Sequence, residues 1–203
     1  MKKLYFSLIL IGFIFSSCSD NSSIVSSESS QVINSKSAVN SGEISNWLSL
    51  PELKEESLRK VYSAKKRIMN SEGGYLEFNE IYETKNGKTI NIFSSLTFPP
   101  NFMDSDDDDT DDFADISMTA DTRTCSYTFT PHMNFNNKPI FNGRYEGLNL
   151  AGINTDKLQF VFQSDAGDLE FIRFEKITVD TENGVLEIQN AIIPHFCRYG
   201  FVN

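Results

Sequence analysis

Residues that commonly carry catalysis or bind transition metals are scarce in this sequence. Its 203 residues include two histidines and three cysteines. His132 and His195 have no cysteines or carboxylates at zinc-ligand spacing, so a zinc site is not expected. The sequence also lacks a nucleophile elbow, a phosphate-binding glycine loop and a paired-carboxylate signature. These absences predict that the protein is not an enzyme. An enzyme that uses scattered carboxylates, such as Glu77, Glu80 or Asp168, is a second hypothesis.

Positive charge and long apolar runs are also in short supply. Lys and Arg total 18 against 28 Asp and Glu, which gives a formal net charge of -10. Phosphate backbones and anionic lipid surfaces repel such a protein, so nucleic acid is not an expected partner. The most apolar run, residues 4–15, has about a dozen residues, whereas a membrane-spanning helix needs about 20. The run is therefore too short to be a transmembrane helix.

The beginning of the chain is typical of a secretory signal. Two lysines precede the apolar run, and two serines and Cys18 follow it. Small residues directly before a cysteine resemble the lipobox of bacterial lipoproteins, although Phe15 stands where Leu or Val is commoner. The resemblance implies that residues 1–17 are a signal peptide. It also implies that fatty acids such as palmitate on Cys18 anchor the exported protein to a bacterial membrane. An ordinary secretory signal with an unmodified Cys18 is the alternative.

Three further segments follow the signal. Residues 18–45 are rich in serine and poor in apolar residues, so they are expected to be a flexible tether. Residues 46–72 are expected to lead into the domain through a helix over Pro51–Met69. Proline suits the first turn of a helix, glutamates follow it, and basic residues lie near the other end. A glycine pair would end this helix, and residues 73–203 then have the length of one domain.

After the predicted helix the apolar period changes from 3.6 to 2, which is typical of strands. Cys125, Tyr127 and Phe129, for example, alternate with serine and threonine. Asn86-Gly87 and Asn183-Gly184 are hairpin-turn dipeptides. About seven to nine short strands with frequent turns predict a mainly β fold, an antiparallel β-sandwich of immunoglobulin-like type preceded by the one helix. The 17 phenylalanines predict an aromatic core between the sheets.

Several short motifs occur in an order that resembles the ZU-five domain, the β-sandwich module of ankyrins, zonula occludens scaffolds and netrin receptors. They are GGYL at Gly73–Leu76, FPPNFM at Phe98–Met103, ISM at Ile116–Met118, PHMNFNNKP at Pro131–Pro139 and IPHFCRYGF at Ile193–Phe201. The chain departs from the family at turn positions: Asn101 to Met103 stand where Gly-Ala-Leu is usual, and Cys197 replaces the closing serine. The resemblance implies a ZU-five-like sandwich that binds or scaffolds, and a fold by itself implies no chemistry.

An aspartate-rich run, DSDDDDTDDFAD, extends from Asp104 to Asp115. Repulsion among its charges predicts an extended, solvated loop. Weak calcium binding is the alternative, because six residues occupy the ligand offsets of an EF-hand loop: Asp104, Asp106, Asp108, Thr110, Asp112 and Asp115. An aspartate stands in place of the turn glycine and another in place of the bidentate glutamate, which weakens that match. Calcium is the one cofactor for which the sequence has a candidate site.

Cys125 and Cys197 share strand faces with aromatic residues, so both are expected to point inward. An oxidising compartment would allow a disulfide between the sheets. The alternative is two buried thiols, which pack as small hydrophobes.

His195, Phe196 and Cys197 resemble the His-Phe-Ser sequence at which some animal relatives of the ZU-five domain cleave themselves. The resemblance implies that Cys197 attacks the Phe196 carbonyl, with His195 assisting proton transfer, and that water then opens the thioester. The alternative is a packing motif with Phe196 in the core.

Together these patterns predict a membrane-anchored, non-catalytic lipoprotein of the bacterial cell envelope that acts as a binding or structural module. The expected partners are the membrane, through the lipid anchor, and an envelope protein or polysaccharide. A tether raises the effective concentration of the domain near its membrane neighbours. A calcium-responsive adhesion module acting through the aspartate-rich run and a self-cleaving domain are the alternatives.

Overall fold

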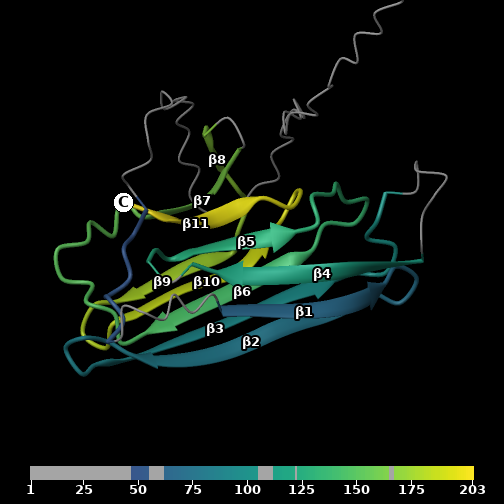
Figure 1. Ribbon diagram of the computed structural model, residues 1–203. Helices are drawn as coiled ribbons and strands as arrows, with labels where there is room; N and C mark the ends of the chain where they lie inside the picture. The colour runs from purple at the N-terminus through teal and green to yellow at the C-terminus, as the bar shows by residue number, and fades with distance from the viewer. Residues whose placement is uncertain (1–46, 55–61, 105–111, 122, 165–166) are drawn as a thin grey trace, which may run out of the picture. The chain divides into compact units, whose positions relative to one another are not determined.

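Two antiparallel sheets enclose one hydrophobic core in the part of the chain that the structure describes (Figure 1). The computed structural model describes residues 47–54, 62–104, 112–121, 123–164 and 167–203. The strands in these ranges are β1 (Tyr62–Met69), β2 (Gly74–Glu83), β3 (Thr89–Phe98), β4 (Phe113–Ala120), β5 (Ser126–Thr130), β6 (Ile140–Glu146), β7 (Gln159–Gln163), β8 (Leu169–Phe171), β9 (Lys176–Asp180), β10 (Val185–Ile192) and β11 (Arg198–Val202).

The six-stranded sheet has the order β1-β4-β5-β11-β7-β8, and the five-stranded sheet has the order β2-β3-β6-β10-β9. All neighbouring strands in these two sheets pair antiparallel. Antiparallel strands with one face on a core and one in water alternate between apolar and polar residues. In β3, for example, Ile90, Ile92 and Leu96 are buried between more exposed neighbours. The predicted mainly β, antiparallel sandwich is therefore confirmed.

The helix predicted over Pro51–Met69 is wrong wherever the structure describes this segment. Its second half is strand β1, which pairs with β4 along its whole length. Residues 51–54 are not helical, and residues 55–61 lie outside the described ranges. Among the described residues, no helix is long and apolar enough to cross a membrane.

Tertiary pairing explains why this helix does not form. Helix propensity is a weak preference that strand pairing and burial override. In β1 the side chains of Tyr62 and Ile68 are buried, which matches an alternating strand face, whereas Lys65, assigned to the apolar face of the helix, is exposed. Because β1 belongs to the six-stranded sheet, the sandwich begins before the expected boundary at residue 73.

Both predicted turn dipeptides lie in hairpin turns, but each loop is longer than two residues. Between β2 and β3, the Thr84 amide donates to the Lys88 carbonyl, which closes a loop around Gly87. Between β9 and β10, Asp180 pairs with Val185. The Asp180 carboxylate also accepts hydrogen bonds from backbone amides inside that loop. The dipeptides therefore mark the turns correctly, and side-chain capping sets their length.

Aromatic rings fill the space between the sheets. Phe129 of β5 lies 5.4 Å from Phe141 of the other sheet and 5.5 Å from Tyr199 of its own sheet, measured between ring centroids. Such pairs add roughly 0.5–1.5 kcal/mol beyond the burial of their area. The fully buried rings include Tyr127, Phe141, Tyr145, Phe160, Tyr199 and Phe201. The aromatic core predicted from the phenylalanine content is confirmed.

A second group of phenylalanines closes one end of the sandwich. Phe98 and Phe102 lie 4.9 Å apart, and Phe135 and Phe196 also lie 4.9 Å apart, between ring centroids. Phe98 joins the two pairs, because its ring is 6.1 Å from that of Phe196. These residues come from the FPPNFM, PHMNFNNKP and IPHFCRYGF motifs, so three segments that are distant in the sequence meet in one aromatic cluster.

Residues 47–50 join the six-stranded sheet beside β11 through backbone bridges, with Leu50 in the core and the Trp47 ring on the outer side of the sheet. Trp47 forms an antiparallel bridge with Val202 and packs with Val161. Its ring covers Gly200 of β11, where an added Cβ would lie 2.7 Å from a ring carbon. The Arg198 guanidinium lies 5.0 Å from the ring centroid, a cation–π contact. The described chain therefore enters the domain on the side of the six-stranded sheet.

Candidate functional site

Several predicted site residues fall outside the described ranges. These residues are Cys18, Asp106, Asp108 and Thr110. The described members of the aspartate-rich run, Asp104, Asp112 and Asp115, are exposed. Across the described ranges, no group of three or more His, Cys, Asp or Glu residues is placed to hold a metal ion.

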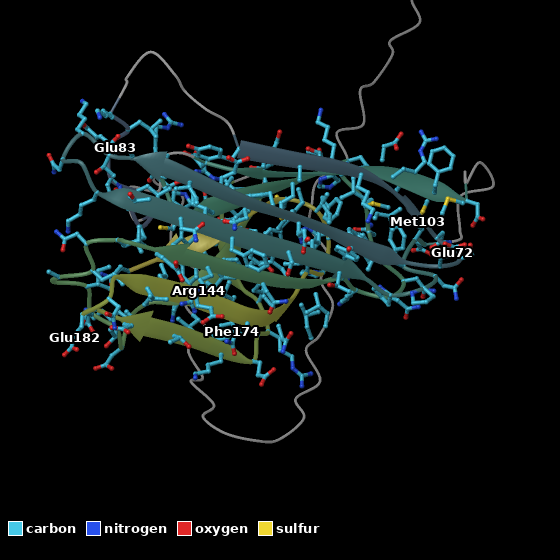
Figure 2. The ribbon with its side chains drawn as sticks, turned by 90° about the horizontal axis from the view of Figure 1, so that it is seen from below. Glu72, Glu83, Met103, Arg144, Phe174 and Glu182 are labelled. Carbon is cyan, nitrogen blue, oxygen red and sulfur yellow. The ribbon has the colours of Figure 1, made fainter. Side chains whose placement is uncertain are left out.

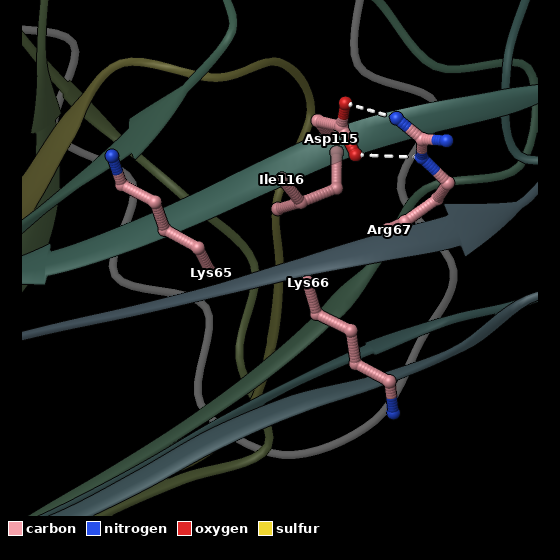
Figure 3. A pocket seen from close by; sticks show the side chains of 5 residues that line it. All are labelled: Lys65, Lys66, Arg67, Asp115 and Ile116. Carbon is pink, nitrogen blue, oxygen red and sulfur yellow. Dashed lines mark hydrogen bonds and ion pairs between the residues drawn. The ribbon is translucent and has the colours of Figure 1, made fainter.

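Asp115, the last candidate calcium ligand, already has a cationic partner (Figure 3). Arg67 donates two hydrogen bonds to its carboxylate, at 2.9 and 2.8 Å. These bonds lower the pKa of Asp115 below its ordinary value. A shallow pocket of about 320 Å³ lies beside the pair and is also lined by Lys65 and Lys66. In Figure 3, Lys66 points away from Lys65 and Arg67, so the three cations do not converge on one ligand.

Of the two alternatives for Cys125 and Cys197, the structure has the thiols and not the disulfide, with Cys125 buried and Cys197 half-buried. They flank the same strand pair, β5 and β11, at opposite ends. The Phe201 amide donates to the Cys125 carbonyl, and the Phe129 amide donates to the Cys197 carbonyl. Four residues separate these positions along the strands, roughly 13 Å. A disulfide requires Cα atoms within about 7 Å, so strand register rules out the bond.

The His195-Phe196-Cys197 motif lies at the aromatic end of the sandwich. Phe196 is fully buried. The Cys197 thiol donates to the Gln163 carbonyl at 2.8 Å, so it is directed toward the main chain of β7. The His195 ring packs edge-on against Phe162, with 4.7 Å between ring centroids. These contacts support the packing interpretation of the motif.

A shallow pocket of about 290 Å³ opens beside Cys197, between residues that adjoin β5, β7 and β11. Its lining includes His132, Gln163 and Arg198. The Arg198 guanidinium donates to the Asp121 carboxylate at 3.2 Å, which offsets its positive charge within the protein. The pocket therefore combines the ring surfaces of Phe129 and Phe196 with polar side chains and has no strong net charge.

A further polar arrangement lies on the five-stranded sheet. We call the side chains of β2, β3, β6, β10 and β9 that point away from the core the outer face. Figure 2 views the molecule from this side, with Arg144 over the sheet. Strand register places one row of side chains across all five strands: Asn79, Phe93, Arg144, Glu187 and Thr178. The row joins an amide, an aromatic ring, a guanidinium and a carboxylate on one surface, and the Thr178 hydroxyl at its end is buried.

Arg144 is the centre of a hydrogen-bonded network on the outer face. Its guanidinium lies 2.7 Å from the Glu146 carboxylate and 3.2 Å from the Glu187 carboxylate. Hydrogen bonding to Glu146 raises the pKa of Arg144 above its ordinary value. Asn91 donates to Glu146 at 3.4 Å, and Gln189 donates to Glu187 at 3.0 Å. Because these side chains hydrogen-bond to one another, the donors and acceptors of the outer face are held in fixed positions.

An irregularity in β10 borders this network. The pairing of β10 with β6 shifts between Ile188 and Ala191, and Asn190 has a φ of 51°. The Asn142 side chain accepts a hydrogen bond from the Asn190 amide at 2.9 Å, which holds the bulge. β-Bulges occur often beside binding sites because they redirect side chains.

Phe93 supplies an apolar surface within the polar row. Its side chain is 38% exposed, which is high for a large apolar residue in the middle of a strand. Ile81 and Tyr75, on neighbouring β2, are 61% and 54% exposed. An exposed ring among fixed polar groups is typical of binding surfaces.

The carboxylates considered for an enzyme do not converge. Glu77 is exposed on the outer face of β2, and Glu80, on the opposite side of the same strand, is half-buried. Asp168 lies directly before β8 in the other sheet. General acid–base catalysis by paired carboxylates needs both groups around one substrate, and this arrangement does not provide that.

The outer face was missed by sequence reasoning, although part of its signal is in the sequence. Strict alternation within β2 and β3 places Asn79, Asn91 and Phe93 on the side of the strands that points away from the core. The register between strands, which brings Phe93 next to Arg144 and Arg144 next to Glu187, depends on pairs distant in the chain. No local pattern specifies those pairs.

Comparison of the chain with protein-family models, curated proteins and solved structures gives no significant match.

Proposed function

We propose that this protein is a membrane-anchored, non-catalytic binding module of the bacterial cell envelope, and that it binds its partner through the outer face of the five-stranded sheet. The observation that carries the proposal is the Arg144 network beside exposed Phe93. Groups that are already fixed lose little entropy on binding, which favours recognition.

On this proposal, one sheet of the sandwich serves attachment and the other serves binding. Trp47, where the described chain begins, packs on the six-stranded sheet. The outer face belongs to the other sheet, so attachment through the N-terminal segment leaves it accessible. On this proposal, a lipid on Cys18 and the serine-rich residues 18–45 hold the module near its partner at high effective concentration.

Sedimentation with native envelope fragments tests the binding surface. The full-length chain would be compared with Phe93→Ala and with Phe171→Ala, each carrying Cys18→Ser so that a lipid does not contribute. We expect Phe93→Ala to lose most of the sedimented fraction. Phe171 is the matched control, because it is 53% exposed on β8 of the other sheet. Equal sedimentation of both variants and the parent chain would refute the proposed surface.

Metabolic labelling with palmitate tests the anchor. The wild-type chain should incorporate label, and the Cys18→Ser chain should not. Label in both chains, or in neither, would contradict lipidation at Cys18.

Sedimentation with envelope fragments, repeated with and without calcium, tests the calcium-responsive alternative. That alternative predicts that the chain binds the fragments only when calcium is present.

A further inference from the structure

We propose that the ligand of the outer face is an uncharged polysaccharide. This inference rests on the proposed function and names the chemical class of the partner. It follows from the charge, the hydrogen-bonding groups and the dimensions of the face.

Charge complementarity favours an uncharged partner. Arg144 lies between Glu146 and Glu187, so its charge is offset on both sides. A polyanion would meet these carboxylates and the exposed Glu77, and it would be repelled by a chain of net charge -10. A polycation would have to compete with Arg144 for carboxylates that already hold it at 2.7 and 3.2 Å.

The hydrogen-bonding groups suit hydroxyls. Asn79, Asn142 and Gln189 each carry an amide, which both donates and accepts, as a sugar hydroxyl does. The Asn91 amide oxygen is buried, so Asn91 acts by donating to Glu146. The carboxylates of Glu146 and Glu187 add acceptors that neighbouring side chains hold in place. A partner with many hydroxyls can pair with these groups without bringing a charge that must be desolvated.

The shape of the face suits a polymer. The accessible groups of its row, from Asn79 to Glu187, lie on four strands that are about 4.8 Å apart, so they extend roughly 14 Å. Phe93 lies within that row and offers a flat apolar surface, on which the C–H face of a sugar ring can stack. Asn79 is its register partner on β2 and can bind hydroxyls at the edge of a stacked ring.

Affinity gel electrophoresis tests the inference on the full-length Cys18→Ser chain. Gels would contain dextran, linear β-glucan or galactomannan as uncharged polymers and polygalacturonate as the anionic one, and polylysine would be added as a competitor. We expect retardation by at least one uncharged polymer, with an affinity that does not fall as salt rises. Phe93→Ala should weaken it about tenfold or more, and Asn79→Ala severalfold. Phe93→Tyr, which keeps the ring, should restore binding, and Phe171→Ala should bind as the parent chain does.

The outcomes separate this inference from the proposed function. If envelope binding depends on Phe93 but no uncharged polymer retards the chain or competes for envelopes, the ligand class is wrong and the binding surface stands. Phe93-dependent binding to polygalacturonate that salt weakens, or competition by polylysine that salt weakens, would also overturn the uncharged class. If envelope binding is the same in Phe93→Ala and Phe171→Ala, the proposed function itself fails.

Discussion

Replacing Gly200 by alanine should destabilise the attachment of the N-terminal segment to the sandwich. The added Cβ would lie 2.6 Å from the Cys125 carbonyl oxygen, 2.6 Å from the Ser126 Cβ and 2.7 Å from the Trp47 ring. Trp47 can rotate away, but the carbonyl is fixed by the hydrogen bond that it accepts from the Phe201 amide. Two of the three collisions therefore remain unless the strands move apart.

The expected cost lies at the upper end of the range for overpacking, about 2–3 kcal/mol. For a domain of this size, that corresponds to a melting temperature lower by roughly 4–12 °C. Urea denaturation followed by far-UV circular dichroism would measure the loss. Trp47 is the one tryptophan in the chain and is 9% exposed, so its emission should shift to longer wavelength if the ring is displaced.

A double-mutant cycle with Trp47→Ala separates the cost of the collision with the Trp47 ring from the cost of the collisions with Cys125 and Ser126. In that background the cost of Gly200→Ala should fall, because one collision is removed, but it should not vanish, because those with Cys125 and Ser126 persist. If Gly200→Ala changes stability by less than about 0.5 kcal/mol and leaves the emission of Trp47 unchanged, the packing described for this side of the sandwich is wrong.

Three further predictions concern the core. Phe196→Ala should cost about 3–5 kcal/mol in urea denaturation, because the ring is fully buried, whereas Phe171→Ala on the exposed β8 should change stability by less than about 0.5 kcal/mol; similar costs would contradict the burial assigned to Phe196. Burial raises the pKa of Cys125 and of three tyrosines (Tyr82, Tyr127 and Tyr145), so the unfolded chain releases these protons first; the free energy of unfolding is unaffected below pH 9 and should decrease as the pH rises above that, and a flat profile up to pH 11 would refute this. Iodoacetamide should label the half-buried Cys197 in the native protein and Cys125 only after unfolding, and reductant should not change the melting temperature; residue-resolved mass spectrometry and a melting curve check both results.

Local patterns predicted the strands and turns well, because alternation and turn chemistry are properties of neighbouring residues. Asn86-Gly87 and Asn183-Gly184 mark real hairpins, and Tyr127 and Phe129 point inward as expected. The β1 segment was misassigned because its apolar residues fit a helical face as well as a strand. Only pairing with β4, about fifty residues later, decides between them.

The failures at the candidate sites share one physical origin, which is register. Alternation gives the face on which a side chain lies, but it does not give its neighbour on the next strand. A bond between Cys125 and Cys197 therefore stayed open as an alternative to two thiols, although their positions along β5 and β11 forbid it. The same missing information concealed the pairing of Arg144 with Glu187 on β10, whereas Glu146 lies two residues along the same strand and shares its face by alternation alone.

The bridge between Trp47 and Val202 places the first residue that the structure describes next to the C-terminal strand β11. Chains with adjacent ends tolerate circular permutation, in which a short linker joins the old ends and new ends are cut in an exposed loop. The hairpin loop at Asn183-Gly184 is one such loop, beside the five-stranded sheet. A permuted chain opened there would keep the same packing, and under the proposed N-terminal anchor it would be attached from the side of the five-stranded sheet. Orientation at a surface thereby becomes a property that can be changed independently of the fold.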